Sequence, residues 1–176
     1  MLARFDSLLT AWRWPALALL ASIAMLATAH GFEHFAYLAP CPLCLRQREV
    51  YWAVIAMTVT ALALWRLRQN HRFMMTFNVM LGLVFLTGAI VAGYHAGAEW
   101  GFWPAPSGCT GDVIDVSAID FSTLDERQAV ASCDEAAWVM LGLSMAGWNA
   151  LVSVGLSLVS FHAARIVFRA RGPMPG

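Results

Sequence analysis

Two pairs of cysteines are the residues of this sequence with the clearest potential for chemistry. Cys41 and Cys44 form a C-P-L-C motif, and Cys109 and Cys133 lie farther along the chain. A disulfide within C-x-x-C closes a very small ring and has little value as a loop staple. The same spacing lowers a thiol pKa and holds a second thiol within reach, which suits redox exchange. The motif therefore favours a redox site over a structural disulfide, a metal site or two inert thiols.

The residues around the motif support this interpretation. Pro40 and Pro42 flank Cys41, and proline is common at the first position of a helix, so we expect a helix to begin near Pro42. The dipole at a helix N-terminus favours a thiolate. Arg48 follows Cys44 by one helical turn, on the same face, and adds a fixed positive charge beside the thiols.

The pairing of the four cysteines has three possible forms. We expect Cys41 with Cys44 and Cys109 with Cys133, because each of these pairs shares one predicted loop. Alone, the second pair would be typical of a plain loop staple. Because the chain also has a pair of redox type, we favour an electron relay between the two pairs. In this relay, Cys109 and Cys133 would face a soluble partner, and Cys41 and Cys44 would face a lipid-soluble electron acceptor.

Long apolar segments must position these cysteines. The chain has 176 residues, of which 60% are hydrophobic and 12% charged. Four segments, at about residues 14–36, 43–65, 73–95 and 138–161, approach or exceed the roughly 20 apolar residues that cross a bilayer. One such segment could be the core helix of a soluble protein, but four leave too little polar chain to cover them. We predict an all-α transmembrane four-helix bundle, as one membrane domain over residues 1–176.

Charge excludes some functions and sets the orientation. The formal net charge is zero, which excludes a basic nucleic-acid binder, and the composition excludes a disordered chain. Because cytoplasmic loops are rich in arginine, we predict cytoplasmic termini and loops on the outer side of the membrane at about residues 37–44 and 96–137. An Ala27-Thr28-Ala29 sequence resembles a signal cleavage site, but we expect the first span to be retained. Eight arginines define the cytoplasmic side: Arg4, Arg13, Arg66, Arg68, Arg72, Arg165, Arg169 and Arg171.

The long loop carries features of its own. Apolar residues between Val113 and Phe121 alternate with acids, which suggests a segment on the membrane surface. Thr123 and Glu126 have the spacing of a capping box, which predicts a short helix toward Ala131. After the loop, Gly142, Ala146 and Ala150 form a small-residue stripe that we place on the fourth span, where it would allow close helix packing.

These motifs resemble the DsbB family, bacterial inner-membrane thiol:quinone oxidoreductases. The resemblance extends over nearly the whole chain and rests on its four spans, the motif between the first two, and the loop cysteines. The matching residues are Pro40-Cys41-Pro42-Leu43-Cys44, Arg48, Trp103-Pro104-x-Pro106-x-x-Cys109, Cys133 and the segment from Gly142 to Asn149.

The resemblance implies a function for each site residue. Cys109–Cys133 would take electrons from a periplasmic DsbA-like thiol oxidase of thioredoxin fold, with Cys109 as the sulfur attacked. Cys41–Cys44 would pass them to ubiquinone, or menaquinone, from the quinone pool of the membrane. Arg48 and His95 would bind the quinone, and no metal would be needed. Position 47 is Gln, whereas the best-known member of the family has Glu there. An acid could therefore assist the quinone only from another position, and Glu49 is one candidate.

Other classes of protein remain as alternatives. His30, Glu33 and His34 fit an H-x-x-E-H zinc pattern, although no third-ligand motif accompanies it. Histidines toward the outer ends of the spans could bind haem, and cysteine with methionine could bind copper. A vitamin K epoxide reductase-like quinone reductase also combines helices, C-x-x-C and loop cysteines, but it usually carries the motif late in the chain.

Overall fold

The chain forms a bundle of four long helices, as predicted. The computed structural model describes Leu9 and residues 12–109 and 132–169. Its helices are α2 (Arg13–Phe35), α3 (Pro42–Leu67), α4 (His71–Glu99) and α5 (Met145–Arg169). Each is long and apolar enough to cross a membrane, so this is a membrane protein whose described residues supply four spans.

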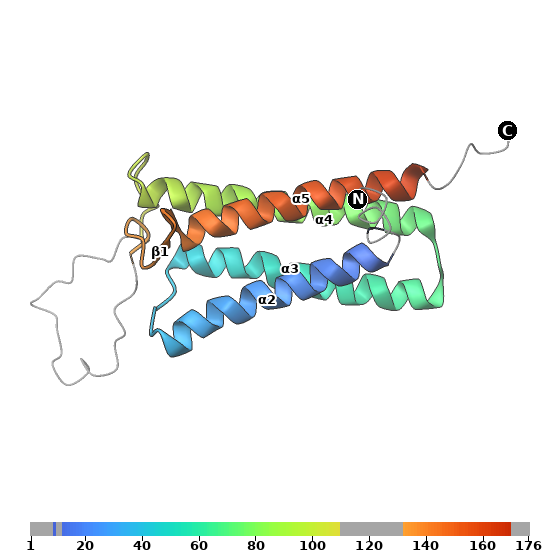
Figure 1. Ribbon diagram of the computed structural model, residues 1–176, viewed down its shortest axis with the longest axis horizontal. Coiled ribbons are helices and arrows are strands. Elements are labelled where there is room, and N and C mark those ends of the chain that lie inside the picture. Colours follow the sequence, from blue (N-terminus) through green and yellow to red (C-terminus); the bar gives the residue numbers. More distant parts are fainter. Residues whose placement is uncertain (1–8, 10–11, 110–131, 170–176) are drawn as a thin grey trace, which may run out of the picture.

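The helices run alternately up and down, which places the cysteines at one end. The α3–α4 connection lies near the start of α2 and the end of α5 (Figure 1). The α2–α3 connection and the hairpin before α5 lie at the opposite end (Figure 1). Both cysteine pairs belong to this second end.

Large apolar side chains cover the outside of the bundle, while small and polar ones fill its interior. Leu20, Ile90 and Leu158 are each more than 60% exposed, as expected for side chains that face lipid. Lipid is as apolar as leucine, so membrane helices associate through close packing and hydrogen bonds. Ser157 illustrates the second contribution, because its hydroxyl donates to the Gly82 carbonyl over 2.8 Å.

Glycine permits the close approach of α4 and α5. A Cβ atom added at Gly82 would lie 2.8 Å from the ring of Phe161, closer than real Cβ contacts. The buried face of α5 is likewise made of small residues, among them Ala146, Ser153 and Ala163. The predicted stripe therefore exists in part, but Gly142 does not belong to it, since it precedes the helix.

The fourth helix begins later than the sequence indicated. The apolar segment expected to span from Trp138 first forms an antiparallel hairpin of β1 (Val139–Met140) and β2 (Leu143–Ser144), and α5 starts only at Met145. Leu141 and Gly142 make the turn, with φ of 52° and 80°. Two positive φ values match the right-handed twist of a two-residue hairpin. Ser144 then caps α5 by accepting from the Gly147 amide over 3.1 Å.

Part of the long loop lies outside the described residues. This applies to the expected surface segment between Val113 and Phe121 and to the short helix predicted from Thr123 toward Ala131.

Candidate functional site

The C-x-x-C motif lies at the start of α3, as the prolines predicted. Pro42 occupies the first turn and Cys41 is the N-cap, whose sulfur accepts from the Cys44 amide over 3.1 Å. Both thiols are free, so the predicted bond between Cys41 and Cys44 is not formed in the structure; Cys41 is buried and Cys44 half-buried. The hydrogen bond with the Cys44 thiol and burial raise the pKa of Cys41, and they outweigh the backbone amides that lower it. Cys41 is therefore held as the neutral thiol in this arrangement.

The second pair is a disulfide packed directly on the first. Cys109 and Cys133 are joined, with their Cα atoms 5.4 Å apart, which confirms the predicted pairing of the loop cysteines. Cys41, Cys109 and Cys133 form one buried group, which we call the sulfur cluster. The chain thus brings both pairs of cysteines together, although they come from different loops.

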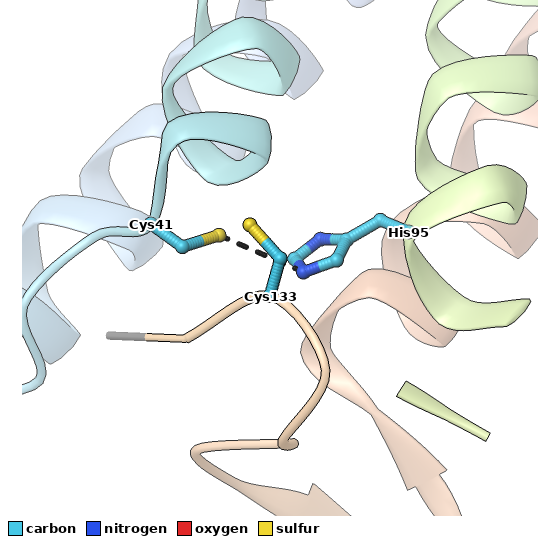
Figure 2. Close-up of side chains that lie close together, drawn as sticks. All are labelled: Cys41, His95 and Cys133. Atoms are coloured by element: carbon cyan, nitrogen blue, oxygen red, sulfur yellow. Dashed lines mark hydrogen bonds between the residues drawn. The ribbon is translucent and has the colours of Figure 1, made fainter. Parts of the chain in front are cut away.

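His95 completes the arrangement around the sulfur cluster. Its Nε2 lies 3.6 Å from the Cys41 sulfur. The sulfurs of Cys41 and Cys133 and a ring nitrogen of His95 all lie within 4.8 Å of one another. Figure 2 shows the Cys133 side chain beside the line that joins Cys41 to the imidazole. His95 was predicted from the sequence as a quinone ligand, and the structure places it next to the thiols.

A chain of buried polar side chains holds the other face of the imidazole. Gln47 Nε2 lies 2.9 Å from His95 Nδ1, and Asn149 Nδ2 donates to Gln47 Oε1 over 2.5 Å. Tyr51 in turn donates to Asn149 Oδ1 and lies 3.1 Å from the Ser153 hydroxyl. Besides His95, sequence reasoning singled out only Gln47 of these residues, as a departure from the family, while Asn149 entered it only as the end of a matching segment. Its members, from α3, α4 and α5, are Ser153, Tyr51, Asn149, Gln47 and His95; we call them the polar chain.

Two acids support the site, and neither was predicted in this role. Glu99 is buried one turn after His95, with its Oε1 3.7 Å from His95 Nε2, and Ser144 of the hairpin donates to its other oxygen.

Glu33 of α2 pairs with Arg48 over 2.5 Å. An acid inside an apolar span needs a partner, and that rule is the signal that could have found Glu33. Glu49, the acid considered from the sequence, instead pairs with Arg46 at an exposed position.

Arg48 projects from α3 toward α2. Besides Glu33, its guanidinium donates to the Ala29 carbonyl over 3.3 Å. The sequence predicted Arg48 near the thiols, and Arg48 and Cys44 line the same cavity.

This cavity, of about 310 Å³, opens beside the thiols. Met25, Leu26, Phe32 and Trp138 are among its apolar lining residues, while its polar end includes Cys44, Gln47, Arg48 and His95. Apolar walls with a few convergent polar groups are typical of sites for small molecules and cofactors. A flat apolar ring with polar oxygens at its edge matches this lining, so the residues fit a quinone head group.

The remaining motifs do not assemble into another site. His30 lies 3.6 Å from Glu33, but that carboxylate is also the partner of Arg48. Within residues 12–109 and 132–169, the cluster of Cys41, His95 and Cys133 is the one group of three such side chains close enough to share an ion. His95 is surrounded by sulfur and the polar chain, so it does not meet His30 or His34 as paired haem ligands would.

The chain is similar to known disulfide bond formation proteins. The family model described as "Disulfide bond formation protein DsbB" matches residues 11–163. The chain is 31% identical over 158 residues to a disulfide bond formation protein B of Paracidovorax citrulli, covering 88% of this chain and 85% of the relative. It is 28% identical to one from a Polaromonas species, covering 82% and 84%, and 27% identical to one from Verminephrobacter eiseniae, covering 93% and 98%. No solved structure matches significantly. The four spans, the paired cysteines and these matches show that the chain belongs to the DsbB family of disulfide bond formation proteins.

Proposed function

We propose that the protein reoxidises a periplasmic DsbA-like thiol oxidase and delivers the electrons to ubiquinone, or menaquinone, in the membrane. One observation carries this proposal: the Cys133 sulfur of the loop disulfide lies within 4.8 Å of the Cys41 sulfur. Thiol–disulfide exchange requires a thiolate to attack a disulfide sulfur directly. The two pairs are therefore close enough to exchange after a small side-chain movement.

The first step joins the partner to the loop pair. A thiolate of the reduced partner attacks Cys109, the Cys109–Cys133 bond breaks, and its electron pair leaves with Cys133. The choice of Cys109 is the one that the family resemblance implies; both residues of the disulfide are buried in the structure.

The second step moves the disulfide between the pairs. The Cys133 thiolate attacks Cys41 of an oxidised Cys41–Cys44 pair, a Cys41–Cys133 bond forms, and Cys44 leaves as the thiolate. The partner's second thiol then attacks its mixed disulfide and releases Cys109 as a thiolate. Cys109 attacks Cys133, restores the loop disulfide and frees Cys41. The partner leaves oxidised, and Cys41 and Cys44 are reduced.

The end state of this sequence has the bonding found in the structure, with the loop pair joined and Cys41 and Cys44 free. A bound quinone supplies an acceptor for two electrons and two protons. Cys44 and Arg48 line the cavity that fits it. Arg48 would favour both a Cys44 thiolate and negative charge on a nearby oxygen, since a fixed cation stabilises charge that develops in the reaction.

The orientation follows from charge. Among the described residues, six arginines lie at the end of the bundle opposite the cysteines, and arginine is retained on the cytoplasmic side. We therefore place the protein in the bacterial inner membrane, with both redox loops in the periplasm, where thiols are oxidised.

The test is quinone reduction by the purified protein supplied with a reduced DsbA-like partner. We expect one quinone to be reduced for each partner disulfide formed, followed by the absorbance of a soluble ubiquinone analogue, with a menaquinone analogue in parallel. Partner oxidation without loss of either quinone would refute the proposal. A Soret band, or bound copper in stoichiometric amount, would favour the binding-protein alternatives.

A further inference from the structure

The polar chain connects the interior of the bundle to the sulfur cluster, and the direction of its hydrogen bonds can be traced. Two hydroxyls, of Tyr51 and Ser153, face Asn149 Oδ1. The amide nitrogen of Asn149 therefore faces Gln47 and donates to its oxygen. This leaves the Gln47 nitrogen facing His95 Nδ1. With an amide donor on Nδ1, the neutral imidazole carries its proton on Nε2.

The opposite side of the ring selects the same tautomer. Glu99 places a carboxylate oxygen 3.7 Å from Nε2. Ser144 holds that carboxylate in place by donating to its second oxygen. A carboxylate beside Nε2 favours a proton there and disfavours a lone pair. Gln47 and Glu99 thus bias the ring in one direction from its two edges.

The Nε2 proton then faces the sulfur atoms that must react with each other. Nε2 is 3.6 Å from the Cys41 sulfur, and Cys133 lies in the same group (Figure 2). In the exchange described above, negative charge appears on Cys133 when the loop disulfide opens, and on Cys41 when the loop disulfide is restored. An N–H donor at this point would stabilise both thiolates, because hydrogen bonds to charged sulfur or oxygen are strong when buried.

We propose that His95 serves the transfer between the two cysteine pairs, and that Gln47 and Asn149 are positioning residues that keep its Nε2–H on Cys41 and Cys133. This inference rests on the proposed function and assigns the thiol-exchange step to a residue expected at the quinone. Atoms and electrons balance as in that exchange, because His95 donates a hydrogen bond and keeps its proton.

The first measurement follows transfer without any quinone. Protein carrying an oxidised Cys41–Cys44 pair is mixed with reduced partner, quenched in acid at set times, alkylated and analysed by mass spectrometry. Asn149→Asp removes the amide donor with little change of size, and Gln47→Met removes both hydrogen bonds of Gln47. We expect each to slow reduction of the Cys41–Cys44 pair about tenfold or more, because each weakens a buried hydrogen bond to a charged sulfur. The mixed disulfide with Cys109 should form at the normal rate.

The second measurement reports the tautomer. In protein labelled with ¹⁵N-histidine, the His95 nitrogen shifts should indicate a proton on Nε2, and Asn149→Asp should shift this population toward Nδ1–H. Ser157→Ala is the matched control, since it removes a buried hydroxyl of α5 whose partner is the Gly82 carbonyl and which lies outside the polar chain. We expect this control to change neither the rate nor the shifts.

Different outcomes separate the two proposals. Normal transfer in both folded variants, or a raised KM for quinone as their sole defect, would overturn the role of His95 in exchange. An Nδ1–H tautomer in the unmodified protein would do the same. If the unmodified protein forms the mixed disulfide but never reduces Cys41–Cys44, the proposed relay itself fails, and this inference with it.

Discussion

Arg48 of α3 and Glu33 of α2 form an ion pair with 2.5 Å between Nη1 and Oε2. A second bond, from Nη2 to the Ala29 carbonyl, ties the same guanidinium to α2. The helix that precedes the C-x-x-C motif thus fixes the cation on the wall of the cavity that the motif lines.

Replacing Arg48 should weaken the use of quinone. We expect Arg48→Ala to raise the apparent KM for a soluble ubiquinone analogue about tenfold, the effect of losing roughly 1.4 kcal/mol of binding. Arg48→Lys should recover only part of this, since a lysine cannot reach two acceptors with a planar fork. Steady-state kinetics with saturating reduced partner measure both variants. An unchanged KM in Arg48→Ala would remove Arg48 from the quinone site.

Glu33 should act through Arg48. We expect Glu33→Gln to raise the quinone KM several-fold, because the guanidinium loses the carboxylate that holds it. In a double-mutant cycle, Glu33→Gln should add little to Arg48→Ala, with a coupling energy of about 1 kcal/mol for this partly exposed pair. Glu49→Gln is the control, since Glu49 pairs with Arg46 away from the cavity. Fully additive effects would show that Glu33 does not act through Arg48.

The two cysteine pairs should be separable by the reductant supplied. Cys109→Ser should abolish oxidation of the protein partner but leave quinone reduction driven by a small dithiol, since Cys41 and Cys44 remain. Cys44→Ser should abolish quinone reduction with either reductant. Both are followed by quinone absorbance and by alkylation of the partner. Full activity of Cys44→Ser would contradict the scheme.

The contact between α4 and α5 should be sensitive to a single methyl group. We expect Gly82→Ala to destabilise the protein in detergent by about 1–3 kcal/mol, because the added Cβ would meet the Phe161 ring. Gly93→Ala, on the same helix, has open space at its Cβ position and should be neutral or mildly stabilising. Thermal unfolding measures both. Equal effects at the two positions would show that the packing of Phe161 adapts freely.

The sequence was sufficient for features that depend on local pattern. Apolar length predicted four membrane helices, proline predicted the start of α3 beside Cys41, and shared loops predicted the Cys109–Cys133 bond. Each follows from chemistry that acts over a few residues or from a strong solvent preference. Hairpin β1–β2 escaped prediction because its residues are as apolar as the helix that follows. The Leu141–Gly142 turn was its one local signal.

The supports of the site could not be predicted in the same way. Glu33, Glu99 and Asn149 act on Arg48 or on His95 and its hydrogen-bond partners across helix contacts, so their roles depend on how the helices pack. The departure at Gln47 shows this well. The sequence indicated a missing acid at that position, whereas the structure surrounds the imidazole with Gln47 on one edge and Glu99 on the other.

Burial of the sulfur cluster has a consequence for electron traffic. Cys41 is 1% exposed and Cys133 0% exposed, so small thiols dissolved in the surroundings have almost no access to the atoms between which the disulfide would pass. The packed loop and the helix ends keep dissolved thiols away from these two sulfurs. Exchange between the two pairs is therefore shielded from dissolved reductants, and Cys44, which is half-buried, is the sulfur of the site that a small dithiol can reach.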